Sequence, residues 1–247
     1  MSREGEVKCN NQGQLMKIVK YKNAHNIWVE FQDEYKFKIH TNYSNFKRGN
    51  VKNPYYKEVY GIGYVGIGKY SRQKTPQIYN TWHHMLRRCY DPYWINKHLT
   101  YIDCYVCDEW HCLQNFGKWY EENYYEVKNE IIDLDKDILN KGNKIYSPTT
   151  CIFSPQRINK LIITNERHRG KLLIGCDERQ GKIRVRCLTS EGSKHLGYFS
   201  LNRPFQAFTV YKNFKENYIK QVADEYKDFI PEKLYDAMYK WEVEIND

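Results

Sequence analysis

The sequence predicts an α+β protein built from several small domains in series. Segments near both ends of the 247-residue chain alternate apolar with polar residues, which is typical of β-strands. The middle of the chain instead has apolar residues at helical spacing. Aromatic residues make up 16% of the chain, so small cores can form although the mean hydropathy is −0.83. No run of about 18 apolar residues is present, and we expect no transmembrane segment.

Residues 1–57 are predicted to form a small β-barrel-like domain. Apolar residues alternate from Leu15 to Tyr21 and again from Ile27 to Phe31 around an Asn-rich turn, which indicates a β-hairpin. A further strand is expected near Tyr35–Ile39 and would complete a small barrel or curled sheet. Residues 58–75 contain four alternating glycines and are predicted to be a hairpin or linker.

Residues 76–166 are predicted to be a second domain that begins with a helix over Ile78–Tyr90. Cys104 and Cys107 are spaced as half of a structural zinc site. A second such pair is missing from the sequence, so small buried cysteines in an aromatic core are the alternative. The remaining zinc ligands would have to come from Cys89, His111, Cys112 or Cys151.

A short strand, a loop, a second strand and a helix are predicted between residues 131 and 163. The first strand, Ile131–Leu134, ends beside Asp135 and Asp137, and the helix that starts near Gln156 carries Asn159. This segment resembles the metal-and-base region of HNH (ββα-metal) nucleases, which implies a degenerate HNH-like domain.

The resemblance implies that Asp135 and Asn159 bind a divalent cation, Mg²⁺ or Mn²⁺, for phosphodiester cleavage. Lys136 stands where these nucleases carry the histidine that acts as general base. Lysine is a poor base unless its pKa is strongly lowered, so the base would be Asp137 or a nearby histidine such as His111. The alternative is a ββα scaffold without catalytic activity, or strand-end acids that bind no metal.

Residues 167–225 are predicted to form a three-stranded antiparallel sheet covered by one helix. Expected strands are Leu173–Arg179, Lys182–Cys187 and His195–Phe199, followed by a helix from about Arg203. This pattern resembles an AP2-like DNA-binding domain, in which the sheet lies in the major groove and strand arginines contact bases and phosphates. The implied DNA-binding residues are Arg179, Lys182, Arg184, Arg186, Lys194 and His195.

The formal net charge of +9 is unevenly distributed. Residues 1–75 carry 14 basic and 6 acidic groups, and residues 167–220 carry 12 and 4, so each block has a balance of +8. Such blocks favour a polyanionic partner, although a solvated lysine-rich surface is the alternative. Residues 226–247 are predicted to be an acidic amphipathic helix that packs on protein.

Taken together, the resemblances imply a phage or mobile-element protein that binds double-stranded DNA, of the homing endonuclease type. Alternatives are a catalytically inactive DNA binder and a counter-defence protein that inhibits a host defence enzyme by binding it. The eight cysteines and the lack of an apolar N-terminal segment lead us to expect reduced thiols and a cytoplasmic location in the host cell.

Overall fold

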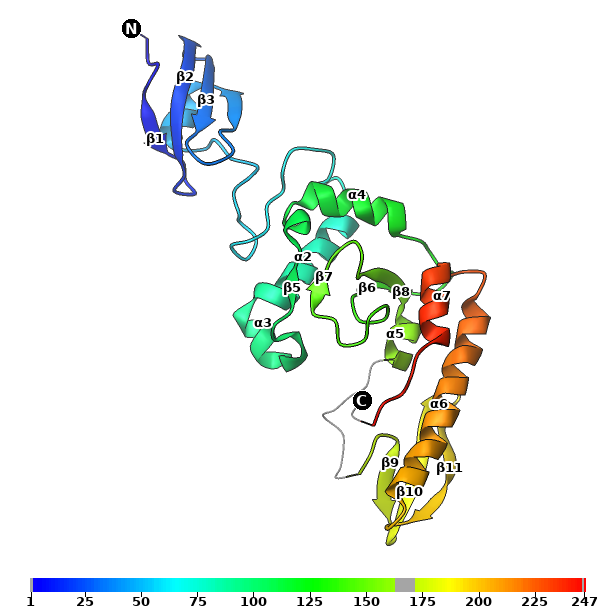
Figure 1. Cartoon of the computed structure of the whole chain (residues 1–247). Coiled ribbons are helices and arrows are strands. Elements are labelled where there is room, and N and C mark those ends of the chain that lie inside the picture. Colours follow the sequence, from blue (N-terminus) through cyan, green and yellow to red (C-terminus); the bar gives the residue numbers. More distant parts are fainter. Residues whose placement is uncertain (1, 163–171, 246) are drawn as a thin grey trace. The chain divides into compact units, whose positions relative to one another are not determined.

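The computed structural model describes residues 2–162, 172–245 and 247 (Figure 1). The chain forms two compact units. The first comprises Met1–Ile102 and Asp108–Lys118, and the second comprises Asp103–Cys107 and Trp119–Asp247. Both units contain helices and strands, so the predicted α+β class is confirmed.

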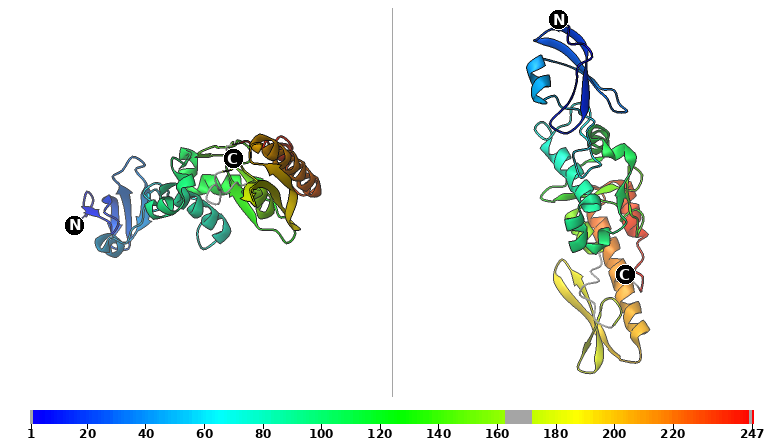
Figure 2. Two further views of the ribbon diagram at one scale, coloured as in Figure 1. Left: turned by 90° about the horizontal axis from the view of Figure 1, so that it is seen from below. Right: turned by 90° about the vertical axis from the view of Figure 1, so that its left-hand side faces the viewer.

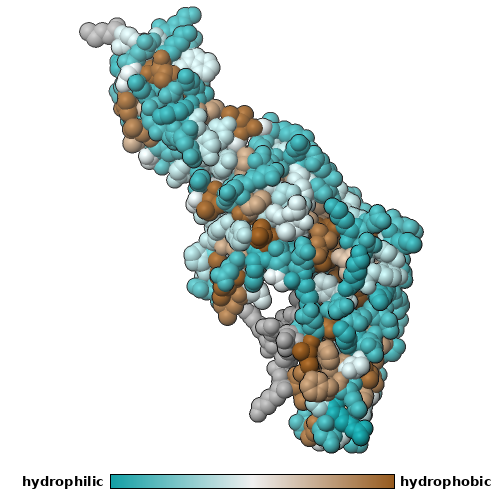
Figure 3. Space-filling model, viewed as in Figure 1, coloured by the Kyte–Doolittle hydropathy of each residue, from teal (hydrophilic) through white to brown (hydrophobic). Residues whose placement is uncertain are grey.

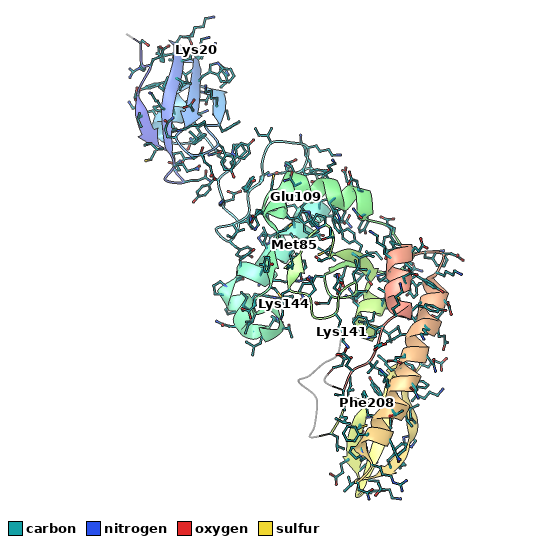
Figure 4. All side chains as sticks on the ribbon, viewed as in Figure 1. Lys20, Met85, Glu109, Lys141, Lys144 and Phe208 are labelled. Atoms are coloured by element: carbon teal, nitrogen blue, oxygen red, sulfur yellow. The ribbon has the colours of Figure 1, made fainter. Side chains whose placement is uncertain are left out.

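The N-terminal part of the first unit is a four-stranded antiparallel sheet in the order β1-β2-β3-β4. Its elements are β1 (Val7–Cys9), β2 (Leu15–Asn23), β3 (Asn26–Phe31), β4 (Lys38–Thr41) and the helix α1 (Tyr43–Arg48). Met16, Ile18 and Val29 are fully buried with Phe46 of α1, because alternate residues of a strand share one face. On the other face Lys20, labelled in Figure 4, is paired with Trp28.

This sheet is open, with β1 and β4 as its edge strands. The predicted hairpin is confirmed by the pairing of β2 with β3. The predicted barrel-like closure is wrong for the described residues, because β4 is followed by α1 and does not pair with β1. Closure depends on pairing between distant edge strands, which alternation within each strand does not specify.

Helices dominate the rest of the first unit. They are α2 (Pro76–Tyr90), α3 (Pro92–Lys97), the 3₁₀ helices η1 (Leu99–Tyr101) and η2 (Asp108–His111), and the start of α4 (Leu113–Asn123). Trp82 of α2 is fully buried and donates its indole hydrogen to the carbonyl of Trp110 at 2.7 Å. Met85, labelled in Figure 4, is buried on the same helix. The predicted linker packs closely on this core: Gly63 lies so near Leu86 that an added Cβ would overlap the Leu86 side chain.

The second unit begins with short paired strands. β5 (Tyr105–Val106) runs parallel to β7 (Ile145–Tyr146), and β6 (Ile132–Asp135) runs antiparallel to β8 (Ile152–Pro155). The helix α5 (Gln156–Ile162) follows β8 directly. The two strands and the helix predicted for residues 131–163 are present as β6, β8 and α5 up to residue 162, whereas β7 between them was not predicted. The predicted domain boundary after residue 166 lies outside the described residues.

A three-stranded antiparallel sheet in the order β11-β10-β9 completes the second unit, with two helices. The elements are β9 (Cys176–Arg179), β10 (Lys182–Thr189), β11 (Gly192–Ser200), α6 (Pro204–Tyr226) and α7 (Glu232–Tyr239). The first half of α6 covers one face of the sheet, where Ala207 and Tyr211 pack on Ile183 and Val185 (Figure 2). Phe208, labelled in Figure 4, packs against the same core.

The second half of α6 belongs to a different core. Its residues Ile219 and Val222 are buried with Ile158 of α5 and with Leu234 and Met238 of α7. The prediction that the C-terminal helix packs on protein is therefore confirmed. Helix α6 joins the ββα segment to the three-stranded sheet, because its first half packs in the core of the sheet and its second half packs in the core that contains α5.

The face seen in Figure 3 is largely hydrophilic, with apolar residues in small patches. Among the described helices, none combines the length and the apolar character needed to cross a membrane.

The unit boundary near residues 102–119 falls inside the region 76–166 that we expected to form one domain. The predicted five-part division of the chain stays a prediction.

Candidate functional site

The uncovered face of the β9–β11 sheet carries most of the residues predicted to bind DNA. Along β10, Ile183, Val185 and Cys187 are buried against α6, and the alternate side chains therefore point to the other face. Cross-strand partners share a face, so the register adds residues from both neighbouring strands. This sheet face includes Asp177, Arg179, Lys182, Arg184, Arg186, His195, Tyr198 and Ser200.

Two cations lie opposite each other at one end of the sheet face. Arg179 and Lys182 are exposed cross-strand partners, joined by a turn in which Gln180 and Gly181 have φ values of 53° and 70°. Positive φ at both central residues is typical of a type I′ turn, for which glycine is well suited. Like charges directly opposite each other are unfavourable in a sheet. An anionic partner at this end would relieve their repulsion.

One carboxylate lies among the cations of this face. Arg184 donates from Nη2 to Asp177 Oδ2 at 2.6 Å and from Nε to both carboxylate oxygens at 3.2 Å. Arg186 Nε donates to Asp177 Oδ1 at 3.1 Å. The hydrogen bonds from Arg184, and the charge of both arginines, hold the pKa of Asp177 below its usual range. The side chain of Arg186 is nevertheless 53% exposed, compared with 19% for Arg184.

Two adjacent residues of β11 lie on opposite faces. His195 pairs with Arg186 and lies on the open face, where its ring is 4.7 Å from that of Tyr198. Lys194 pairs with Cys187, and its ammonium lies 5.1 Å from the centre of the Phe214 ring of α6. The expectation that Lys194 shares the face of the arginines is therefore wrong.

Asp135 lies at the end of β6, as predicted, and caps the loop that follows. Its Oδ1 accepts hydrogen bonds from the backbone nitrogens of Asp137 and Ile138 at 2.7 and 2.8 Å. Burial raises the pKa of Asp135 above its usual range, and the two backbone hydrogen bonds oppose that shift. This geometry is that of a strand-end cap, which was the alternative to a metal ligand.

Lys136 is buried, with 5% of the residue exposed, and its ammonium is fully engaged. The Nζ donates to both carboxylate oxygens of Asp137 at 2.8 and 2.7 Å and to the carbonyl of Asn143 at 2.7 Å. It also lies 5.9 Å from the centre of the Tyr146 ring. All three hydrogen bonds of this ammonium are made within the loop between β6 and β7, so Lys136 is placed to stabilise that loop.

The other proposed catalytic residues are divided between the two units. Asn159 of α5 is buried, with 7% exposed, and its Oδ1 has no hydrogen-bond partner among the described residues. His111 belongs to the first unit, where its Nδ1 is 3.7 Å from Asp108 Oδ1 and its ring packs edge-on against Tyr90.

The expected donor set does not fit a metal-dependent nuclease site. Oxygen donors are present at Asp135 and Asn159, but the carboxylate of Asp137 is paired with Lys136. Within the described residues, no three histidine, cysteine, aspartate or glutamate side chains are grouped to hold a metal ion.

The predicted zinc pair flanks β5 in the second unit. Cys104 is buried and Cys107 is partly buried. Burial raises the pKa of the Cys104 thiol, and it raises that of the Cys151 thiol to about 12. Buried thiols in an apolar core are the alternative that the sequence left open, and the zinc site stays a prediction.

Sequence reasoning missed Asp177, Tyr198 and Ser200 among the residues of the sheet face. Tyr198 is 51% exposed and is the cross-strand partner of Arg184. Counting from the turn at Gln180 and Gly181 places Asp177 opposite Arg184, but the bulge in the β10–β11 register prevents the same count from placing Tyr198.

No family model matches this chain, and neither the curated proteins nor the solved structures that were compared with it provide a match.

Proposed function

We propose that this protein binds duplex DNA through the uncovered face of the β9–β11 sheet. The observation that carries the proposal is the register, which places Arg179, Lys182, Arg184 and Arg186 on one face away from α6. Rows of cations on a rigid sheet match the regular spacing of phosphates along a strand of DNA.

The residues of this face support different contacts. Arg179, Lys182 and Arg186 have exposed side chains and are suited to phosphate oxygens. Arg184 is more buried and is oriented by Asp177, so its fixed guanidinium is suited to positioning and not to a flexible phosphate contact. Tyr198 adds a phenol beside Arg184 that is suited to a sugar or phosphate oxygen.

We further propose that the ββα segment acts as a scaffold for the sheet and not as a nuclease. The support for this proposal is the engagement of Lys136 with Asp137 and Asn143, together with the shared core of α5 and α6. In this account the cap formed by Asp135 and the buried Lys136 stabilise the loop after β6. DNA binding is then the function of the sheet alone.

The test is the salt dependence of affinity for a labelled DNA duplex, measured by fluorescence anisotropy. Changing Lys182→Gln together with Arg186→Gln removes two phosphate contacts, so the slope of log affinity against log salt should fall by about 0.9 for each contact. The control Lys233→Gln with Lys240→Gln removes the same charge from exposed positions of the acidic tail. Equal losses in both double variants, or no duplex binding by the unaltered chain, would contradict the proposal.

A further inference from the structure

A second feature of the second unit, separate from the sheet face, is a cavity of about 480 Å³. Its walls come from the loop before β6, from α5, from the turn between β10 and β11, and from the middle of α6. A volume of this size is in the range of small-molecule sites. The proposed DNA contacts with the sheet face do not use it.

Positive charge exceeds negative charge in the lining of the cavity, which includes Arg157, Lys160 and Lys215 but only one carboxylate, Glu130. Lys215 of α6 is partly buried and forms no ion pair with a carboxylate of the described residues. Lys160 of α5 donates to the neutral Gln156 Oε1 at 2.8 Å. Arg157 is different, because its Nη2 is paired with Glu225 at 2.7 Å.

Burial of an ammonium without a partner is unfavourable, and here it lowers the pKa of Lys215. The nearby titratable groups are the Cys187 thiol and the Tyr218 phenol, and neither is an anion at neutral pH in an ordinary environment. An anion in the cavity would satisfy Lys215 and add a partner for Lys160. The excess of positive charge in the lining therefore favours an anionic ligand.

Hydrogen-bonding groups for such an anion are already fixed in place. The Tyr218 hydroxyl accepts from the Ser190 backbone nitrogen at 2.8 Å and lies 3.1 Å from the Ser190 hydroxyl. These bonds anchor the β10–β11 turn to α6 beside Lys215. A phosphate group needs several donors at once, and two ammonium groups with neighbouring hydroxyls supply them.

The remaining wall is apolar. Leu161 and Val222 are buried side chains, whereas Ile131 and Leu188 are 64% and 73% exposed at the rim. Exposure of large apolar side chains beside a cationic cavity is typical of a site for an amphiphilic ligand. A phosphate alone would leave this wall uncovered.

We propose that this cavity binds a phosphate monoester whose organic part is apolar or aromatic and about the size of a nucleoside. Lys215 and Lys160 hold the phosphate, and Leu188 and Ile131 cover the organic part. The same chemistry occurs in a free mononucleotide and at a 5′-phosphorylated strand end, so the experiment includes both.

The test uses the full chain and isothermal titration calorimetry with adenosine monophosphate, inorganic phosphate and a short oligonucleotide with or without a 5′-phosphate. Adenosine monophosphate or the phosphorylated strand should bind, and the Lys215→Met variant should weaken that binding about tenfold or more. Leu188→Ser should weaken binding of the nucleotide but not of inorganic phosphate. Lys220→Met, on the same helix but outside the cavity lining, is the control.

Lys215→Met removes an uncompensated charge, so its melting temperature without ligand should equal or exceed that of the unaltered chain. This second measurement separates loss of binding from loss of folding. Binding of the free nucleotide supports a small-molecule site, and binding of the phosphorylated strand alone supports a strand-end site. Binding of no probe, or equal binding by the Lys215→Met and unaltered chains, would overturn the proposal.

Discussion

Replacing Lys136 with methionine tests whether this residue is a structural element or a degenerate catalytic one. Methionine has a similar length and apolar character but donates no hydrogen bond. The change therefore removes the two bonds to Asp137 and the one to Asn143 without creating a large cavity.

The expected cost follows from the environment of the ammonium. Breaking a buried ion pair by removing one partner costs roughly 3–5 kcal/mol. The side chain of Asp137 is 45% exposed, so water can solvate it after the change and the cost is reduced. We expect Lys136→Met to lower the free energy of unfolding of the second unit by about 2–3 kcal/mol.

Urea unfolding followed by circular dichroism measures this cost, with one transition fitted for each unit. Lys144→Met is the matched control, because Lys144 is an exposed lysine of the same loop (labelled in Figure 4). The control should change the free energy of unfolding by less than about 0.5 kcal/mol. If the two variants unfold at the same urea concentration, the structural role assigned to Lys136 is incorrect.

Two further predictions concern the sheet face and the ββα segment. Asp177→Asn should raise affinity for duplex DNA about fivefold at low salt. The two arginines keep the Asp177 carboxylate ionised at neutral pH, and its repulsion of a nearby DNA phosphate costs about 1 kcal/mol, which the change removes. Anisotropy checks this against Asp236→Asn on α7, which should have no effect, and an unchanged or weaker affinity for Asp177→Asn would count against the sheet face. Plasmid incubated with the protein and Mg²⁺ or Mn²⁺ should remain supercoiled on an agarose gel, and cleavage that disappears in Asp135→Ala would show that the scaffold assignment is wrong.

Local sequence patterns determined most of the secondary structure of the second unit. The alternation in Lys182–Cys187 correctly assigned Ile183 and Val185 to the buried face, because a strand places successive side chains on opposite sides whatever it packs against. The amphipathic pattern of the C-terminal helix likewise predicted burial of Leu234 and Met238.

A bulge shows why the binding face was not fully predictable. The register between β10 and β11 shifts between Val185 and Arg186, so that His195 pairs with Arg186 and Lys194 with Cys187. With a regular register the two residues of β11 would exchange faces, because a shift by one residue inverts every side chain. The bulge depends on how both strands pair, which neither strand specifies alone.

The sequence by itself determined the α+β class, the elements β6, β8 and α5, the order of strands and helix in residues 172–226, and the concentration of positive charge in two blocks. Tertiary structure decided that the N-terminal sheet stays open, that Lys136 is an internal hydrogen-bond donor, and that Lys215 lines a cavity. These outcomes depend on contacts between residues distant in the sequence. Hydrophobic periodicity predicts which face of a helix or strand is buried, but it does not predict which other element packs against that face.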